Sequence, residues 1–291
     1  MNFVRKAGWR LICLILAALV AVCYSPRNFL SAEMTQEQKS SYSVAVLLSL
    51  VIGFLFKRLR WFHHIDTWIH EFGHATMVTI FGGQPKYIKL NQDSSGVTSF
   101  RQTKFSPFRD VVISAAGPLA SVFALYVSSM LVMRGLVLVE LQTFAFVVLL
   151  VLISTVRSAF GWVVGILIWA SMAVSVGLGL SAVLGLHFGA APEVYVGAVL
   201  GLGAGVAIRA SFSRLRFAGP NSDEGKISYH VHLPVSLVVW VLAAMNLFVV
   251  WSALSLVDLA NWHGIGVLGS LDIQREIQQL IAWVHSIKIT Q

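Results

Sequence analysis

The chain has 291 residues, of which 57% are hydrophobic and only 12% are charged, and its formal net charge is +8. Soluble domains carry about 25% charged residues, so this composition excludes an ordinary soluble protein and predicts an all-α polytopic membrane protein. The basic residues gather in short connections between apolar runs, which is typical of charges that set membrane orientation, and we expect no nucleic-acid partner.

Apolar runs that approach the ~20 residues of a spanning helix recur along nearly the whole chain. They predict about seven to eight transmembrane helices. The first run follows a basic N-terminus, as in a signal peptide, but the residues before Tyr24 match a cleavage site poorly, so a retained helix is expected. The predicted spans are 11–27, 41–57, 61–82, 108–133, 137–156, 159–185, 193–208 and 231–256. The span at 193–208 is rich in glycine and is expected to pack against other helices rather than lipid.

Three polar segments stand apart from these runs. Residues 83–107 combine turn-forming residues with two short alternating stretches, which predicts a small β-hairpin at the membrane surface. Residues 209–229 predict a basic connection that contains glycine and proline. The tail after Asn261 repeats apolar residues at three- and four-residue steps, which predicts an amphipathic helix.

The distribution of basic residues predicts the sidedness of the connections. Segments 83–110 and 209–226 are both rich in Lys and Arg, which places them in the cytoplasm. The stretch "KRLR" at 57–60 conflicts with this, because it and segment 83–110 flank the same span. The sidedness of the helix at 61–82 therefore stays open.

The stretch "HEFGH" lies inside the span at 61–82 and holds His70, Glu71 and His74. Residues four apart on an α-helix lie on the same side, one turn apart, so both imidazoles can bind one metal ion. Glu71 is then placed to act as general base toward a zinc-activated water, as in zinc peptidases with a His-Glu-x-x-His motif. Ionisable groups inside a membrane are costly and indicate function. A metal-free cluster of hydrogen-bonded histidines is the structural alternative.

One ligand is missing from this helix, because a catalytic zinc usually has three protein ligands and an open position. Acidic residues are few in the chain. The stretch "GPNSDEGK" at 219–226 holds two of them, on the same predicted side as the segment that follows the histidine helix. Asp223 is the expected third ligand, and Glu224 is the alternative.

These motifs resemble those of one protein family. "HEFGHATMVTIFGG" (70–83) is similar to the zinc-binding helix of the M50 intramembrane metallopeptidases, the site-2 protease superfamily. "ISAAGPLASVFALY" (113–126) is similar to the Ala-Gly-Pro helix of that family. "RSAFGW" (157–162) and "NSDEGKISYHVHLPVSLVVW" (221–240) resemble elements of its M50B-like branch, and the resemblance runs in order from about residue 61 to 250.

The resemblance implies zinc bound by His70, His74 and Asp223, with Glu71 as the general base. It also implies an M50B-like metallopeptidase membrane domain at 61–256, preceded by N-terminal transmembrane helices (1–60) and followed by an amphipathic tail (257–291). The chain departs from better-known members at Glu224, which replaces a glycine after the aspartate.

The sequence therefore predicts an intramembrane zinc endopeptidase that hydrolyses peptide bonds of membrane-embedded substrates with a zinc-activated water. One alternative is a non-proteolytic relative that binds or escorts membrane proteins. A second is a metal transporter, which would need further ionisable residues along the other spans. The expected partners are a membrane-protein substrate and the lipid bilayer, and the expected location is the plasma membrane of a bacterium, as a multi-pass protein. The oligomeric state stays open.

Overall fold

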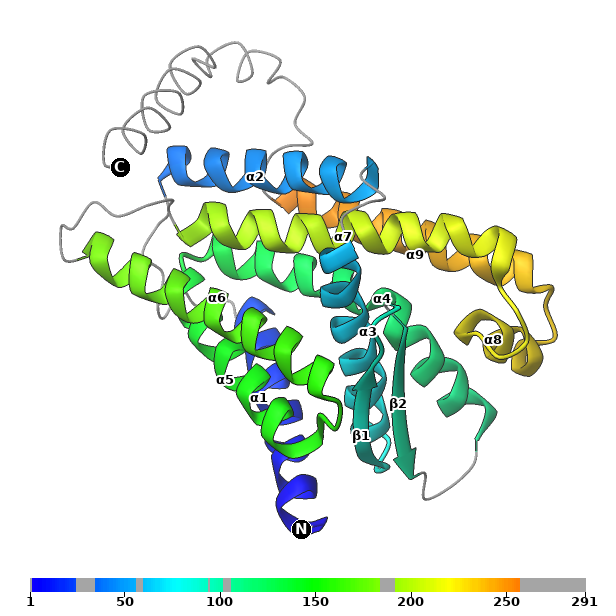
Figure 1. Ribbon diagram of the computed structural model, residues 1–291. Coiled ribbons are helices and arrows are strands. Elements are labelled where there is room, and N and C mark those ends of the chain that lie inside the picture. Colours follow the sequence, from blue (N-terminus) through cyan, green and yellow to red (C-terminus); the bar gives the residue numbers. More distant parts are fainter. Residues whose placement is uncertain are drawn as a thin grey trace.

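The computed structural model describes residues 2–24, 35–55, 60–93, 95–101, 106–183 and 192–256. Most of these residues are helical, and one two-stranded sheet is present among them (Figure 1). The elements are, in chain order, α1 (Asn2–Tyr24), α2 (Gln36–Leu55), α3 (Arg60–Ile80), β1 (Gln84–Leu90), β2 (Gly96–Arg101), α4 (Pro107–Met133), α5 (Val137–Thr155), α6 (Ala159–Val183), α7 (Pro192–Phe217), α8 (Asp223–Val231) and α9 (Val235–Leu256).

The predicted fold class, an all-α polytopic membrane protein with a small hairpin, is confirmed. Within the described residues, six helices are long and apolar enough to cross a membrane, namely α1, α2, α4, α5, α7 and α9. The other two expected spans correspond to α3 and α6. Neither is among the six. Polar side chains interrupt the apolar sequence of α3, and the apolar stretch of α6, Ala159–Val174, is shorter than those of the six spans.

Helix α7 is longer than the sequence predicted. The basic connection expected at 209–229 is wrong in its first part, because residues 209–217 continue the helix. Arg and Leu are good helix formers, and the chain leaves the helix only before Gly219 and Pro220, where proline lacks an N–H donor. The expected packing of this glycine-rich helix is confirmed, since 61% of its apolar window is buried, the largest share among the six spans. The predicted amphipathic tail lies outside the described residues.

Helices α2 and α7 run parallel and approach closely along a row of glycines. A Cβ added to Gly197 would meet Tyr42, one at Gly201 would meet Val46, and one at Gly205 would meet Leu50. The contacts advance together along both helices, and they involve backbone atoms of α2 at each step. Small residues four apart allow such backbone contact between helices in a membrane. Figure 1 shows the two helices side by side.

The hairpin of β1 and β2 lies along α3 (Figure 1), which confirms the β-hairpin expected at 83–107. Ile88 of β1 is fully buried in the core beside Trp68 of α3. The other edge of β1 is covered, because Ile88 forms a parallel bridge with Val156 and accepts a hydrogen bond from the N–H of Arg157 at 3.1 Å. Among the described residues, β2 pairs only with β1. Its outer edge is therefore the open edge of this sheet. The position of the hairpin at the membrane surface stays a prediction.

Candidate metal centre

Helices α3 and α4 run antiparallel, and this brings His74 against the backbone of α4. Near the start of α3, Asp66 accepts a hydrogen bond from Ser121 at 2.5 Å. Two turns later, His74 Nδ1 lies 2.6 Å from the carbonyl oxygen of Ile113. A carbonyl oxygen only accepts hydrogen bonds, so Nδ1 carries the proton. The Nε2 atom of neutral His74 therefore presents a lone pair, which is the state that a metal ligand requires.

Three side chains converge at this point of α3. The Nε2 atoms of His70 and His74 are 3.1 Å apart. Oδ2 of Asp223 lies 3.0 Å from His70 Nε2 and 3.3 Å from His74 Nε2. Within the part of the chain that the structure describes, these three residues form the one group of His, Cys, Asp and Glu side chains whose ligand atoms all lie within 4.8 Å of one another.

Asp223 reaches the histidines from the first turn of α8. Ser222 is the N-cap of this helix, and its side chain accepts a hydrogen bond from the N–H of Gly225 at 3.1 Å. A capping serine fixes where a helix begins, so it sets the position of the next residue, Asp223. The second carboxylate oxygen, Oδ1, lies 3.7 Å from Lys226 Nζ, one turn further on.

The charge state of Asp223 suits a metal ligand. Burial acts to raise the pKa of this carboxyl, but the neighbouring imidazoles of His70 and His74 outweigh burial and hold the pKa well below its ordinary value. The carboxyl is therefore ionised at neutral pH. Glu224, the alternative ligand, is also buried, but it lies outside the converging group.

The donor set fits a bound metal ion. Two imidazole nitrogens and one carboxylate oxygen are ligand types of catalytic zinc sites. Such lone-pair atoms repel one another at this distance unless a proton or a cation lies between them. Gly117 of α4 lets both imidazoles pack against this helix, because a Cβ added there would lie 2.6 Å from His70 Nε2 and nearer still to His74. A side chain at this position would displace the imidazoles from the arrangement that brings their Nε2 atoms to Asp223.

Glu71 lies next to this group and faces strand β2. Its side chain is buried, with 6% of its surface exposed. The hydroxyl of Thr98 lies 2.6 Å from Glu71 Oε2 and 3.0 Å from the backbone oxygen of Glu71. A Cβ added to Gly96 would lie 2.7 Å from Glu71 Oε1. Both carboxylate oxygens are thus held against the first residues of β2.

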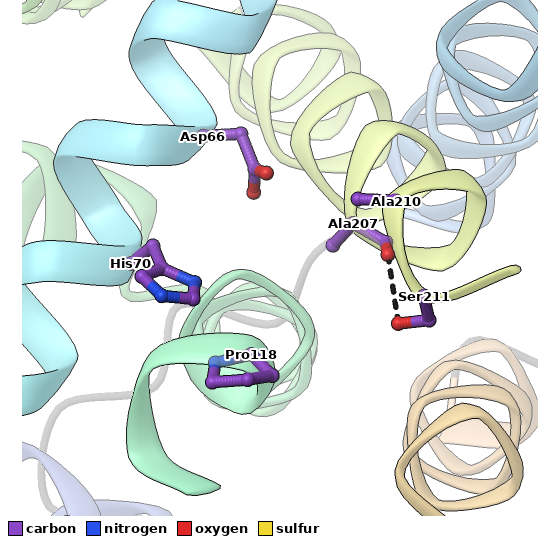
Figure 2. A pocket seen from close by; sticks show the side chains of 6 residues that line it. All are labelled: Asp66, His70, Pro118, Ala207, Ala210 and Ser211. Atoms are coloured by element: carbon purple, nitrogen blue, oxygen red, sulfur yellow. Dashed lines mark hydrogen bonds between the residues drawn. The ribbon is translucent and has the colours of Figure 1, made fainter. Parts of the chain in front are cut away.

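A small polar pocket lies beside His70 (Figure 2). His70 and Asp66 of α3 point into it, and Pro118 of α4 closes one wall. The opposite wall is the end of α7, with Ala207, Ala210 and Ser211, where the Ser211 hydroxyl donates to the carbonyl of Ala207 at 3.0 Å. His70 therefore meets Asp223 and His74 and also lines this polar pocket between three helices.

Comparison with known proteins identifies the family of this chain. A family model described as "Peptidase M50B-like" matches residues 41–253. The chain belongs to the Peptidase M50B-like family. This confirms the family predicted from the motifs, and it makes the chain a multi-pass membrane protein of a metallopeptidase family. Searches of curated proteins and of solved structures give no match. The M50B-like match includes all of α3 and α4 as well as Asp223.

The structure brings together the four residues that the sequence singled out, and it adds residues that sequence reasoning missed. Thr98 and the carbonyl of Ile113 hold Glu71 and His74 in place. Gly117 gives the two imidazoles room against α4. Gly117 lies within the Ala-Gly-Pro stretch, which was a usable signal. The role of Thr98 had no signal, because it depends on where β2 lies against α3.

Proposed function

We propose that this protein is an intramembrane zinc endopeptidase that hydrolyses peptide bonds of membrane-embedded proteins. One observation carries the proposal: His70, His74 and Asp223, from two helices about 150 residues apart in the chain, direct three metal-binding atoms at one point. Membership of the M50B-like family supports the same reaction class. The buried carboxylate of Glu71 beside this point supplies the general base that hydrolysis needs.

In this proposal, Nε2 of His70, Nε2 of His74 and Oδ2 of Asp223 bind the zinc ion. When bound, zinc polarises the peptide carbonyl and lowers the pKa of water to about 7. Nδ1 of His74 keeps its proton and donates it in a hydrogen bond to the Ile113 carbonyl, which keeps the ring oriented. Lys226 beside Oδ1 leaves Oδ2 as the ligand atom of Asp223.

Glu71 moves the proton in this mechanism. One of its carboxylate oxygens accepts a proton from the attacking water as the water oxygen bonds to the peptide carbon. The same carboxyl then returns the proton to the nitrogen of the leaving amine as the peptide bond breaks. Glu71 ends the cycle ionised, as it began.

The substrate must expose its backbone, because the carbonyls of an intact helix are already bonded within the helix. The outer edge of β2 offers N–H and C=O groups for pairing with an extended segment, and the Thr98 side chain of the same strand contacts Glu71. We therefore propose an unwound transmembrane segment as substrate. The lipid bilayer is the other partner, and the plasma membrane of a bacterium is the proposed location.

The test compares the purified parent protein with Glu71→Gln, each reconstituted in liposomes with single-span peptides labelled at both ends. We expect about one zinc ion per chain in both proteins. General acid–base groups typically contribute 10²- to 10⁴-fold, so the variant should cleave more slowly by about that factor.

Two results would contradict the proposal. Zinc-loaded parent protein that cleaves none of the peptides would favour a binding or escort function. Zinc that crosses the liposome membrane equally well in the parent and the variant, without cleavage, would favour a transporter.

A further inference from the structure

We propose that Thr98 is the positioning residue for the general base, so that strand β2 sets the orientation of Glu71. The inference rests on the proposed function, because it assigns Thr98 a part in the same reaction. Its starting point is the short hydrogen bond of 2.6 Å that the Thr98 hydroxyl donates to Glu71 Oε2. Thr98 contacts the carboxylate of Glu71 rather than the metal-binding group, so it acts through Glu71.

The hydroxyl restricts a side chain that is otherwise mobile. A glutamate has several rotatable bonds, and each populates more than one staggered position. Glu71 is buried, and an ionised oxygen without a hydrogen bond would be costly there. Thr98 satisfies this requirement for Oε2, and the backbone of Gly96 limits the position of Oε1. The carboxylate is thereby fixed on the β2 side of α3.

The strand holds the hydroxyl rigidly in turn. Thr98 pairs directly with Ile88 of β1, whose side chain is fully buried in the core beside α3. Side chains directly opposite each other point to the same face of a sheet, so Thr98 also faces α3. As a β-branched residue it has few side-chain rotamers. A shift of β2 therefore moves the hydroxyl, and the hydroxyl moves Glu71.

This arrangement couples the open edge of the sheet to the reaction. The outer edge of β2 is where an extended substrate segment would pair, and the inner face of the same strand holds the general base. When a substrate segment pairs with β2, it restricts the movement of this strand, and it thereby restricts the movement of Glu71 as well. Loss of the Thr98 hydroxyl should therefore slow the turnover of bound substrate and leave substrate binding unchanged.

The experiment compares the parent with Thr98→Val, Thr98→Ser and Ser99→Ala, all as full-length protein in liposomes. Thr98→Val keeps the shape and removes the hydroxyl, whereas Thr98→Ser keeps the hydroxyl. Ser99→Ala removes a hydroxyl from the same strand at a side chain that points to the other face. Zinc content, kcat and KM for a labelled single-span peptide are measured for each protein.

Misplacing a reacting group by about 1 Å costs on the order of 10²-fold. We therefore expect kcat of Thr98→Val to fall about 10- to 100-fold, with KM and zinc content unchanged. Thr98→Ser should recover most of the parental kcat, and Ser99→Ala should retain it.

Several results would overturn the inference. They are a parental kcat in Thr98→Val, a failure of Thr98→Ser to recover activity, or a loss of zinc or of folded protein in Thr98→Val. An inactive parent protein would instead overturn the proposed function, and the role of Thr98 with it.

Discussion

Glycine serves different ends at two of the helix contacts in this protein. Between α2 and α7, Gly201 and Gly205 let backbone meet backbone. Between α3 and α4, the three atoms nearest to a Cβ at Gly117 all belong to the imidazoles of His70 and His74. The first contact holds two spans together, and Ser49 of α2 crosses it with a hydrogen bond to the carbonyl of Gly197 at 3.3 Å. The second gives the two imidazoles room against α4. The atoms that a glycine contacts therefore show whether it supports the packing of two helices or the arrangement of the candidate metal ligands.

The same contrast shows where the protein tolerates change. At Gly117 an added side chain would meet the imidazoles, so a substitution there should weaken metal binding and leave the fold. At Gly205 it would meet the backbone of α2, so a substitution there should weaken the fold and leave metal binding. Substitutions at the candidate metal site and at the α2–α7 contact should therefore have opposite effects on metal binding and on stability.

The largest effect is expected at the ligand itself. Asp223→Asn removes the negative charge from the group that α8 brings to the two histidines. Loss of an outer partner of a metal ligand costs about 10- to 100-fold in metal affinity, so loss of a charged ligand should cost at least about 100-fold. Competition with a chelator measures the zinc affinity.

Glu224→Gln is the matched control, because it removes the neighbouring charge from the same turn of α8. We expect this variant to bind zinc as the parent does. Equal and small effects of the two substitutions would mean that Asp223 is not the third ligand.

Gly117→Ala should separate metal binding from folding. The added Cβ meets imidazole atoms and no backbone of another element among its three nearest atoms, so the helices have little reason to move. We expect a fall in zinc affinity of about 10- to 100-fold, comparable to the loss of an outer ligand partner. The helical circular dichroism should match that of the parent. Full zinc binding in this variant would show that the space beside the histidines is not needed for the ion.

Gly205→Ala should do the reverse. Its Cβ would lie about 3.0 Å from the backbone carbon of Leu50 and the backbone nitrogen of Phe54, neither of which can rotate away. Overpacking of this kind costs about 1–3 kcal/mol. We expect unfolding at lower detergent concentration in a sodium dodecyl sulfate titration, with unchanged zinc per folded molecule.

The smallest effect on stability is expected for Gly203→Ala, which is the control for Gly205→Ala. It lies in the same helix, but a Cβ added there meets nothing within 4 Å. Alanine is a better helix former than glycine by about 1 kcal/mol. Gly203→Ala should therefore leave stability unchanged or raise it slightly. Equal destabilisation by both substitutions would contradict a specific contact between α2 and α7.

The sequence predicted the parts of this protein that depend on local spacing. Two histidines four apart and a nearby carboxylate define a helix face by themselves, and the scarcity of acidic residues singled out Asp223. Helix α7 exceeds its predicted length, because the charge of Arg209 indicates a connection although arginine also suits a helix. Local spacing carries no information on how two elements align. The Ile113 carbonyl and Thr98 depend on how α4 and β2 align with α3, and this alignment is set by packing.

X-ray absorption at the zinc edge tests the central claim most directly, because it reports the atoms bound to the metal in the purified parent protein. We predict one zinc ion per chain, bound by nitrogen and oxygen at about 2.0–2.2 Å, with the signature of two imidazoles. The chain has two cysteines, Cys13 and Cys23, as the alternative source of a strong ligand. Sulfur at about 2.3 Å, or protein without zinc, would contradict a metal centre of His70, His74 and Asp223.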